Sequence, residues 1–324
     1  MSEIEVTGAA TQTWNAQKAI LRLQDAIDFV NRRIINREEA VEQIFCALLT
    51  GEHALIQSRT GVGKSLMVDQ IFRMFDGART FRVQASKEQQ PDTYFGALDI
   101  DRLQKGELVH NTTGSLVESE LGFIDEIFDA NDYTLRALLS LLNERALVLG
   151  VQQIASPLHT VVAATNYLRI TEITEALLDR FAYQAVAWPD TDAHDQYRIA
   201  RQYLTHGGRA MNPPAKIPFD DLRIVTDICR GRSDLVTIDV PQPVIYYANL
   251  VVSYYQELRN REIEQSTGER DFYISPRKQM KAFDLLRAVT FMHGRTTVGF
   301  DDVDRLVVLF TTVGVEEERA TWRK

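Results

Sequence analysis

Ser58-Arg59-Thr60-Gly61-Val62-Gly63-Lys64-Ser65 is the stretch that decides the fold. An apolar run, residues 54–56, precedes it, and an amphipathic segment, residues 66–75, follows it. A strand, a glycine-containing loop and a helix in this order are the context that a phosphate-binding loop requires. The backbone N–H groups of such a loop and the N-terminus of its helix surround phosphate oxygens. The stretch therefore predicts a nucleotide site, and the alternative is a surface turn in which Gly, Lys and Ser adjoin by chance.

The side chains of this loop have separate predicted roles. Lys64 places a cation at the β- and γ-phosphates, and the Ser65 hydroxyl can coordinate Mg²⁺. The predicted nucleotide-binding residues are Arg59, Thr60, Gly61, Val62, Gly63, Lys64 and Ser65. Ser58 stands where such loops usually have glycine, a change that is tolerated if its φ is negative.

Composition and charge exclude several classes of protein. The 324 residues are 45% hydrophobic and 25% charged, as in soluble globular proteins. A net charge of -9 gives no general attraction to nucleic acid or anionic membranes, although a local basic patch is compatible with it. Cys46 and Cys229 lie in apolar helical patterns, which favours buried thiols in a reducing compartment. No apolar run approaches the length of about 18 residues that spans a membrane, and residues 1–13 lack a signal-peptide core. We expect a cytoplasmic protein without a transmembrane segment.

Strands and helices alternate between residues 50 and 190, which predicts a doubly wound, mostly parallel α/β sheet. Core strands are expected at residues 54–56, 80–84, 121–124, 159–165 and 183–187. Two hairpins interrupt this order. The first consists of two short strands within residues 98–115, joined at residues 104–106. The second has strands at 146–149 and 151–155 and turns at Gly150.

Beyond Pro189 the pattern is helical throughout. Helices are expected at residues 192–203, 220–229, 241–261, 276–293 and 301–310. The predicted division is a flexible leader at residues 1–15, an α/β nucleotide-binding core at 16–208 and a smaller all-α domain at 209–324.

Two adjacent carboxylates, Asp125 and Glu126, follow the apolar run 121–124. Phosphoryl transfer depends on positioning and charge neutralisation more than on covalent chemistry. Asp125 can hold Mg²⁺, usually through water, and Glu126 can orient and polarise the attacking water. A solvated strand end is the alternative, and the upstream phosphate loop makes it the less favoured one.

Asn166 and Arg180 are candidates for sensing and stabilising the γ-phosphate. Asn166 ends the apolar run 161–165 and can help to position the water, and an Asn that closes a turn is the alternative. Arg180, in Leu177-Leu178-Asp179-Arg180-Phe181, can act as an arginine finger supplied to a neighbouring subunit. The alternative for Arg180 is a charge partner on a surface helix.

Arg277 is a further candidate. Ser275 and Pro276 precede it and mark the start of a helix. An arginine in the first turn opposes the helix dipole, which favours a functional role over a stabilising one.

Taken together, these motifs resemble the AAA+ ATPases and, within them, the MoxR family. The segments that carry the resemblance are Asp125-Glu126-Ile127, residues 138–145, Ala163-Ala164-Thr165-Asn166, Leu178-Asp179-Arg180-Phe181 and Ser275-Pro276-Arg277. Phe95-Gly96-Ala97-Leu98 and residues 106–116 are most similar to the RavA branch. The resemblance covers residues 22–313 and implies a P-loop NTPase core followed by a helical lid.

The resemblance also implies roles for single residues. Lys64 and Ser65 correspond to Walker A, Asp125 and Glu126 to Walker B, Asn166 to sensor 1, Arg180 to the arginine finger and Arg277 to sensor 2. Residues 98–115 would include the helix-2 insert, and residues 147–155 the hairpin before sensor 1. Three features depart from the family pattern: Ser58, Asn131 where many relatives have a basic residue, and no RavA-type C-terminal domain after the lid.

An arginine finger acts on a neighbouring subunit, so we expect a homo-hexameric ring in which Mg²⁺-dependent ATP hydrolysis moves the lid against the core. The resemblance implies chaperone-like remodelling or maturation of a protein client, with a von Willebrand factor A (vWA) domain protein as adaptor. A DNA motor is the first alternative, but the insert is mainly acidic, so no nucleic acid partner is expected. A nucleotide-gated scaffold with little turnover is the second, and Glu126 and Arg180 argue against it.

Overall fold

The computed structural model describes residues 14–324 apart from 107–108, 150–151, 169–170, 208, 269, 271 and 313–314. Most of the predicted leader, residues 1–15, therefore lies outside the described residues. The chain divides into two compact units, an α/β unit at residues 26–219 and a helical unit that combines residues up to 25 with 220–324. This division follows Phe219, whereas the sequence pattern predicted one after residue 208.

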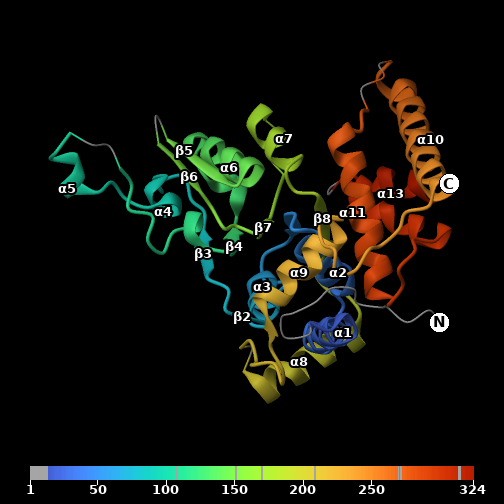
Figure 1. Cartoon of the computed structure of the whole chain (residues 1–324), viewed down its shortest axis with the longest axis horizontal. Helices are drawn as coiled ribbons and strands as arrows, with labels where there is room; N and C mark the ends of the chain where they lie inside the picture. The colour runs from blue at the N-terminus through green and yellow to red at the C-terminus, as the bar shows by residue number, and fades with distance from the viewer. Residues whose placement is uncertain are drawn as a thin grey trace. The chain divides into compact units, whose positions relative to one another are not determined.

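The α/β unit is built on a five-stranded sheet in which every pair of neighbours is parallel (Figure 1). Its spatial order is β3 (Thr80–Gln84), β4 (Leu121–Asp125), β7 (Thr160–Thr165), β1 (Ala54–Ser58) and β8 (Tyr183–Ala187). The three central strands are almost wholly buried, as expected for strands of a parallel sheet covered on both faces. The predicted doubly wound α/β fold is confirmed.

Along the chain, helices alternate with these strands as the sequence predicted (Figure 1). They are α1 (Ala16–Arg33), which contains the boundary between the units, α2 (Glu38–Thr50), α3 (Lys64–Phe72), α6 (Asp132–Glu144), α7 (Glu172–Leu178) and α8 (Ala193–His206). α2 is buried along most of its length and ends at Gly51, whose φ of 64° suits a glycine C-cap. Its apolar residues therefore belong to the core of the α/β unit.

The segment between β3 and β4 differs from the predicted hairpin. It contains α4 (Asp92–Phe95), α5 (Ile100–Leu103) and the 3₁₀ turn η1 (Leu116–Glu118). Among the described residues of this segment, antiparallel pairing consists of one bridge between Leu98 and His110. Hydrogen bonds from Asp99 N to Val109 O and from Asn111 N to Ala97 O, both 2.8 Å, flank this bridge. The predicted strand at residues 98–100 is wrong because the Asp99 side chain caps α5 by accepting from Arg102 N, which turns the chain into a helix. The strand predicted after residues 104–106 includes residues 107–108, which lie outside the described residues.

The second predicted hairpin is confirmed. β5 (Ala146–Leu149) pairs antiparallel with β6 (Gln152–Ala155), and the expected turn at Gly150 lies outside the described residues. A second short sheet was not predicted. β9 (Ile217–Pro218) pairs parallel with β2 (Phe75–Asp76), so the prediction of an entirely helical chain beyond Pro189 is wrong at these two residues.

The helical unit contains α9 (Phe219–Cys229), α10 (Gln242–Thr267), α11 (Pro276–Met292), η3 (Phe300–Leu306), α12 (Val307–Phe310) and α13 (Glu316–Trp322). The helix expected at residues 301–310 is a 3₁₀ segment followed by one α-turn, and α13 was not predicted. Tyr255 of α10 packs against the Trp322 ring of α13, with centroids 5.0 Å apart, and Trp322 stacks on Phe310. These aromatic contacts attach the last helix to the unit. None of the described helices combines the length and apolar character needed to cross a bilayer.

Candidate nucleotide site

The loop between β1 and α3 has the backbone of an anion-binding turn. Gly61 and Gly63 have φ values of +85° and +83°, in the left-handed region that glycine adopts without a Cβ penalty. A Cβ added at either position would meet no atom within 4 Å, so the space beside the loop is open. α3 begins at Lys64, immediately after Gly63, and its first N–H groups have no partners within the helix. This cradle fits a phosphate group.

Lys64 is the centre of a network that joins three strand ends. Its side chain is only 7% exposed, and its ammonium donates to Asn166 Oδ1 at 2.8 Å and to Glu126 Oε1 at 3.2 Å. Asp125 Oδ1 lies 3.5 Å from the same nitrogen. The carboxyl ends of β1, β4 and β7 lie at one edge of the parallel sheet, which brings together residues about 40 to 100 positions apart.

Glu126 is held by its backbone and by Asn166. Its φ of +52° is left-handed, a conformation that costs a non-glycine residue on the order of 1 kcal/mol. The Glu126 N–H donates to Asp125 Oδ1 at 3.0 Å, and the Asn166 N–H donates to Glu126 Oε2 at 3.0 Å. The Asn166 side-chain amide also donates to Glu126 Oε1. The turn therefore directs the Glu126 carboxylate toward Lys64 and Asn166.

Ser65 and Asp125 provide the donor set that a magnesium ion requires. The Ser65 hydroxyl lies 3.4 Å from Asp125 Oδ2, so both oxygens face the same small volume beside the loop. Mg²⁺ prefers hydroxyl, carboxylate and phosphate oxygens and keeps several waters. The residues present fit this ion.

One predicted site residue of the α/β unit, Arg180, is not part of this cluster. The Arg180 guanidinium pairs with Asp179 at 2.6 Å and makes no hydrogen bond to Lys64, Asp125 or Glu126 within the described part of the chain. Its Nε is buried without a hydrogen-bond partner there. Arg277 lies in the first turn of α11, in the helical unit, where Ser275 caps the helix by accepting from Lys278 N. The role predicted for Arg277 stays a prediction.

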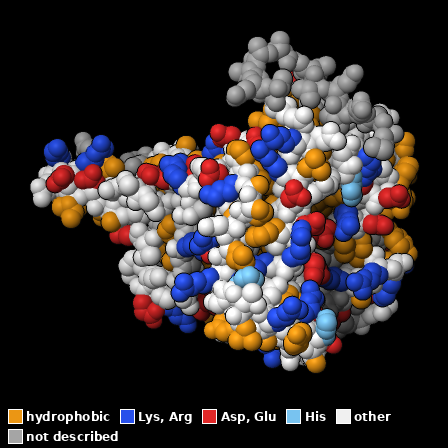
Figure 2. Space-filling view, turned by 90° about the horizontal axis from the view of Figure 1, so that it is seen from below, with side chains coloured by type: hydrophobic (Ala, Val, Ile, Leu, Met, Phe, Trp, Pro, Cys, Tyr) orange, Lys and Arg blue, Asp and Glu red, His pale blue; other side chains and the backbone are white. Residues whose placement is uncertain are grey.

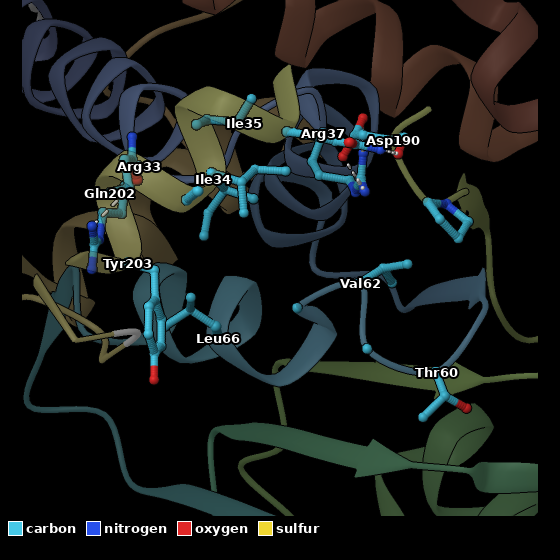
Figure 3. Close-up of a pocket in the computed structure, with 16 residues that line it drawn as sticks. Arg33, Ile34, Ile35, Arg37, Thr60, Val62, Leu66, Asp190, Gln202 and Tyr203 are labelled. Carbon is cyan, nitrogen blue, oxygen red and sulfur yellow. Dashed lines mark hydrogen bonds and ion pairs between the residues drawn. The ribbon is translucent and has the colours of Figure 1, made fainter. Parts of the chain in front are cut away.

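A cavity of about 510 Å³ adjoins the phosphate loop within the α/β unit (Figure 3). One end is formed by residues 60–63 and the other by Ile199 and Tyr203 of α8. Ile34 and Ile35, from the bend between α1 and α2, form an apolar wall. The sequence analysis assigned this bend no role. The available signal was the pair of apolar residues, Ile34 and Ile35, next to the polar Asn36.

A buried ion pair supports this cavity. Arg37 Nη2 lies 2.9 Å from Asp190 Oδ2, Arg37 Nη1 lies 3.2 Å from Oδ1, and the two side chains are 7% and 3% exposed. Asn36 also donates to the Asp190 carboxylate. The pair joins the bend after α1 to the segment after β8 (Figure 3). No sequence pattern indicates a contact between positions so far apart.

Arg33 lies at the far side of the cavity. It donates to Gln202 Oε1 at 3.3 Å and to Arg209 O at 2.9 Å, and burial lowers the pKa of its guanidinium. The Nε atoms of Arg33 and Arg37 are both buried without a partner among the described residues. The cavity wall thus combines apolar surface with arginine side chains.

Residues 21–207 match the family described as the MoxR domain in the MoxR-vWA-beta-propeller ternary systems, and residues 251–314 match an AAA lid domain. A protein of Methanocaldococcus jannaschii without an assigned function is 23% identical over 89% of this chain and 70% of its own length. A structural protein of Acidianus two-tailed virus is 23% identical over 89% of this chain and 48% of its own length. The chaperone MoxR1 of Mycobacterium tuberculosis is 27% identical over 57% of this chain and 52% of its own length.

The chain thus spans about half the length of the last two of these relatives. Among solved structures, a candidate ATPase from Cytophaga hutchinsonii has the same fold, with a TM-score of 0.70 and 17% identity over 90% of this chain and 86% of the other.

Proposed function

Because this chain belongs to the MoxR family of AAA+ ATPases, we propose that it hydrolyses ATP to ADP and phosphate and couples the reaction to work on a protein client. The observation that carries this proposal is the meeting of Lys64, Glu126 and Asn166 beside an open glycine loop. A cation, a candidate base and an amide then converge where the γ-phosphate of a bound triphosphate would lie.

In this proposal the triphosphate lies on residues 59–65 and the base enters the adjoining cavity. Ile34, Ile35 and Tyr203 supply apolar and aromatic contacts for a planar base. The cavity is therefore the support for a nucleotide as ligand.

Ser65 and Asp125 would hold Mg²⁺, directly or through water. When bound, the ion neutralises charge on the phosphate oxygens. The remaining steps fall to the chain itself. The γ-phosphate competes with Glu126 for the Lys64 ammonium, and the freed carboxylate can then orient and polarise water. Asn166, which is bonded to Glu126 and Lys64, would position that water.

We further propose that the active form is a homo-hexameric ring. Within its own chain the Arg180 side chain is bound to Asp179 and is not part of the Lys64 cluster. The Arg180 side chain is 24% exposed, so a neighbouring subunit's phosphate could reach its guanidinium. Arg277 is proposed as sensor 2, the residue that links the helical lid to the nucleotide.

The family description supports a vWA domain protein as adaptor, and the chaperone name of one relative supports remodelling as the work done. The RavA-like segment between β3 and β4 would be one client-facing part, because Ile100 and Leu103 of α5 are 68% and 45% exposed. α5 extends away from the sheet of its own unit (Figure 1). We place the protein in the cytoplasm, where Cys46 and Cys229 would stay reduced.

Nucleic acid is not part of this proposal. A DNA motor needs a continuous basic track for phosphates. Figure 2 shows a face on which Lys and Arg side chains are interspersed with Asp, Glu and apolar ones. The segment between β3 and β4 contains the acidic residues Asp99, Asp101 and Glu118 and the basic residues Arg102 and Lys105. This pattern favours a protein client.

Steady-state phosphate release with Mg²⁺ and ATP tests the proposed reaction. Lys64→Ala should abolish nucleotide binding in a fluorescent-nucleotide titration. Glu126→Gln should bind as the parent does and release no phosphate, and Lys87→Ala, an exposed lysine outside the site, is the control. Phosphate release by Glu126→Gln at the parental rate would remove the role proposed for that carboxylate. Sedimentation with and without ATP tests the ring.

A further inference from the structure

Tyr167 and Asp129 connect the two turns that carry Glu126 and Asn166. Asp129 ends the 3₁₀ turn η2 (Ile127–Asp129), which follows Glu126 after β4. Tyr167 follows Asn166 after β7, the strand next to β4 in the sheet. The Tyr167 hydroxyl donates a hydrogen bond to Asp129 Oδ1. One hydrogen bond therefore joins the segments just beyond the two candidate catalytic residues.

The Tyr167 backbone is fixed by Thr165, whereas its side chain is partly exposed. The hydroxyl of Thr165, which is 1% exposed, donates to Tyr167 O at 2.6 Å and accepts from Tyr167 N at 3.3 Å. The Tyr167 side chain is 46% exposed. A ring this exposed gains little from burial, so the bond to Asp129 contributes to fixing its position.

Asn166 donates two hydrogen bonds to the neighbouring turn, and the Glu126 carboxylate accepts both of them. That carboxylate must change partners if it is to act on water, and its bonds to Asn166 then weaken or move. The Tyr167–Asp129 bond does not involve the reacting groups. It can keep the two turns at a constant separation while Glu126 exchanges its partners.

We propose that Tyr167 and Asp129 are positioning residues that keep Asn166 at a constant position relative to Glu126 during turnover. This inference rests on the proposed ATP hydrolysis. It predicts a defect in the chemical step and not in nucleotide binding, because neither residue belongs to the phosphate loop or lines the cavity.

The test compares Tyr167→Phe, Asp129→Ala, Asp129→Asn and the double variant Tyr167→Phe/Asp129→Ala. Tyr167→Phe should lower kcat about three- to tenfold, and KM and the Kd for ADP should change less than about twofold. Asp129→Ala should lower kcat by the same factor as Tyr167→Phe. The double variant should be no slower than either single variant, because all three variants lose the same interaction. Asp129→Asn keeps an acceptor oxygen and should restore most of kcat.

Tyr133→Phe is the matched control, since Tyr133 is 80% exposed and lies close by in the first turn of α6. Parental kcat in Tyr167→Phe would overturn this inference and leave ATP hydrolysis standing. Losses that multiply in the double variant, or a raised KM with unchanged kcat, would overturn it as well. A parent protein that binds ATP and hydrolyses none would overturn the proposed function and this inference with it.

Discussion

Replacing Asp190 with alanine should lower the free energy of unfolding of the α/β unit by about 3 kcal/mol. The substitution leaves Arg37, which is 8% exposed, as a buried guanidinium without its carboxylate. Breaking one side of a buried pair costs about 3–5 kcal/mol, because the remaining charge keeps its desolvation penalty. We expect the lower end of this range because Arg37 Nη1 also donates to Asn36 O at 2.5 Å.

For a unit of this size, residues 26–219, each kcal/mol shifts Tm by about 2–4 °C, so the variant should melt roughly 6–12 °C below the parent. Differential scanning calorimetry measures this shift, and urea unfolding gives the free energy independently. Nucleotide affinity should fall with stability, because the pair also shapes the cavity wall. Arg37→Met/Asp190→Leu should recover most of the stability, since both charges leave together.

The matched control is Asp76→Ala. Asp76 pairs with Lys216 at 3.0 Å in the same unit, but these side chains are 67% and 52% exposed. An exposed pair contributes about 0–1 kcal/mol, so this variant should melt close to the parent. The reasoning fails if Asp190→Ala costs no more than Asp76→Ala, or if the paired double variant is less stable than Asp190→Ala.

Arg180→Ala should leave nucleotide affinity unchanged and lower ring-dependent turnover by about 10³-fold or more, and mixing with Lys64→Ala should restore part of the phosphate release through hybrid interfaces. Gly96→Ala should destabilise the segment between β3 and β4 by at least about 2 kcal/mol, because φ is +96° and the new Cβ would lie 2.0 Å from Asn111 O. Limited proteolysis checks this, with Gly106→Ala, where nothing lies within 4 Å, as the milder control. Burial raises the pKa of Glu318 above its ordinary value of 4.5, so the folded state holds that proton more tightly than the unfolded chain does. The stability of the helical unit should therefore decline as pH rises above about 4.5, and Glu318→Gln should reduce this decline in thermal melts between pH 4 and 8.

Much of the candidate site could be predicted because it lies at strand ends. Apolar runs before Lys64, Asp125 and Asn166 indicate buried strands, and parallel strands end at the same edge of a sheet. The position of each of these three residues just after a predicted strand was therefore enough to expect their side chains to lie close together. The structure adds that Lys64 is bonded to Glu126 and Asn166, a pairing that no spacing indicates.

The wrong predictions of secondary structure concern short segments in which two local structures compete or in which a distant strand decides the pairing. Asp99 could extend a strand or cap a helical turn, and the cap forms. Ile217 and Pro218 lie in a polar linker, and their pairing with Phe75 and Asp76 depends on a partner strand far along the chain. Short elements such as these carry too few residues for a periodic pattern.

By itself, the sequence determined the parallel α/β core, the glycine-containing loop after its first strand and the position of the carboxylate pair, because those features follow from hydrophobic periodicity and from residues next to one another in the chain. Only the tertiary structure decided the cavity between Ile34 and Tyr203, the Arg37–Asp190 pair that supports it and the bond from Tyr167 to Asp129. The physical reason is that local patterns encode which face of an element is buried. Which distant side chains then meet depends on how the buried faces pack.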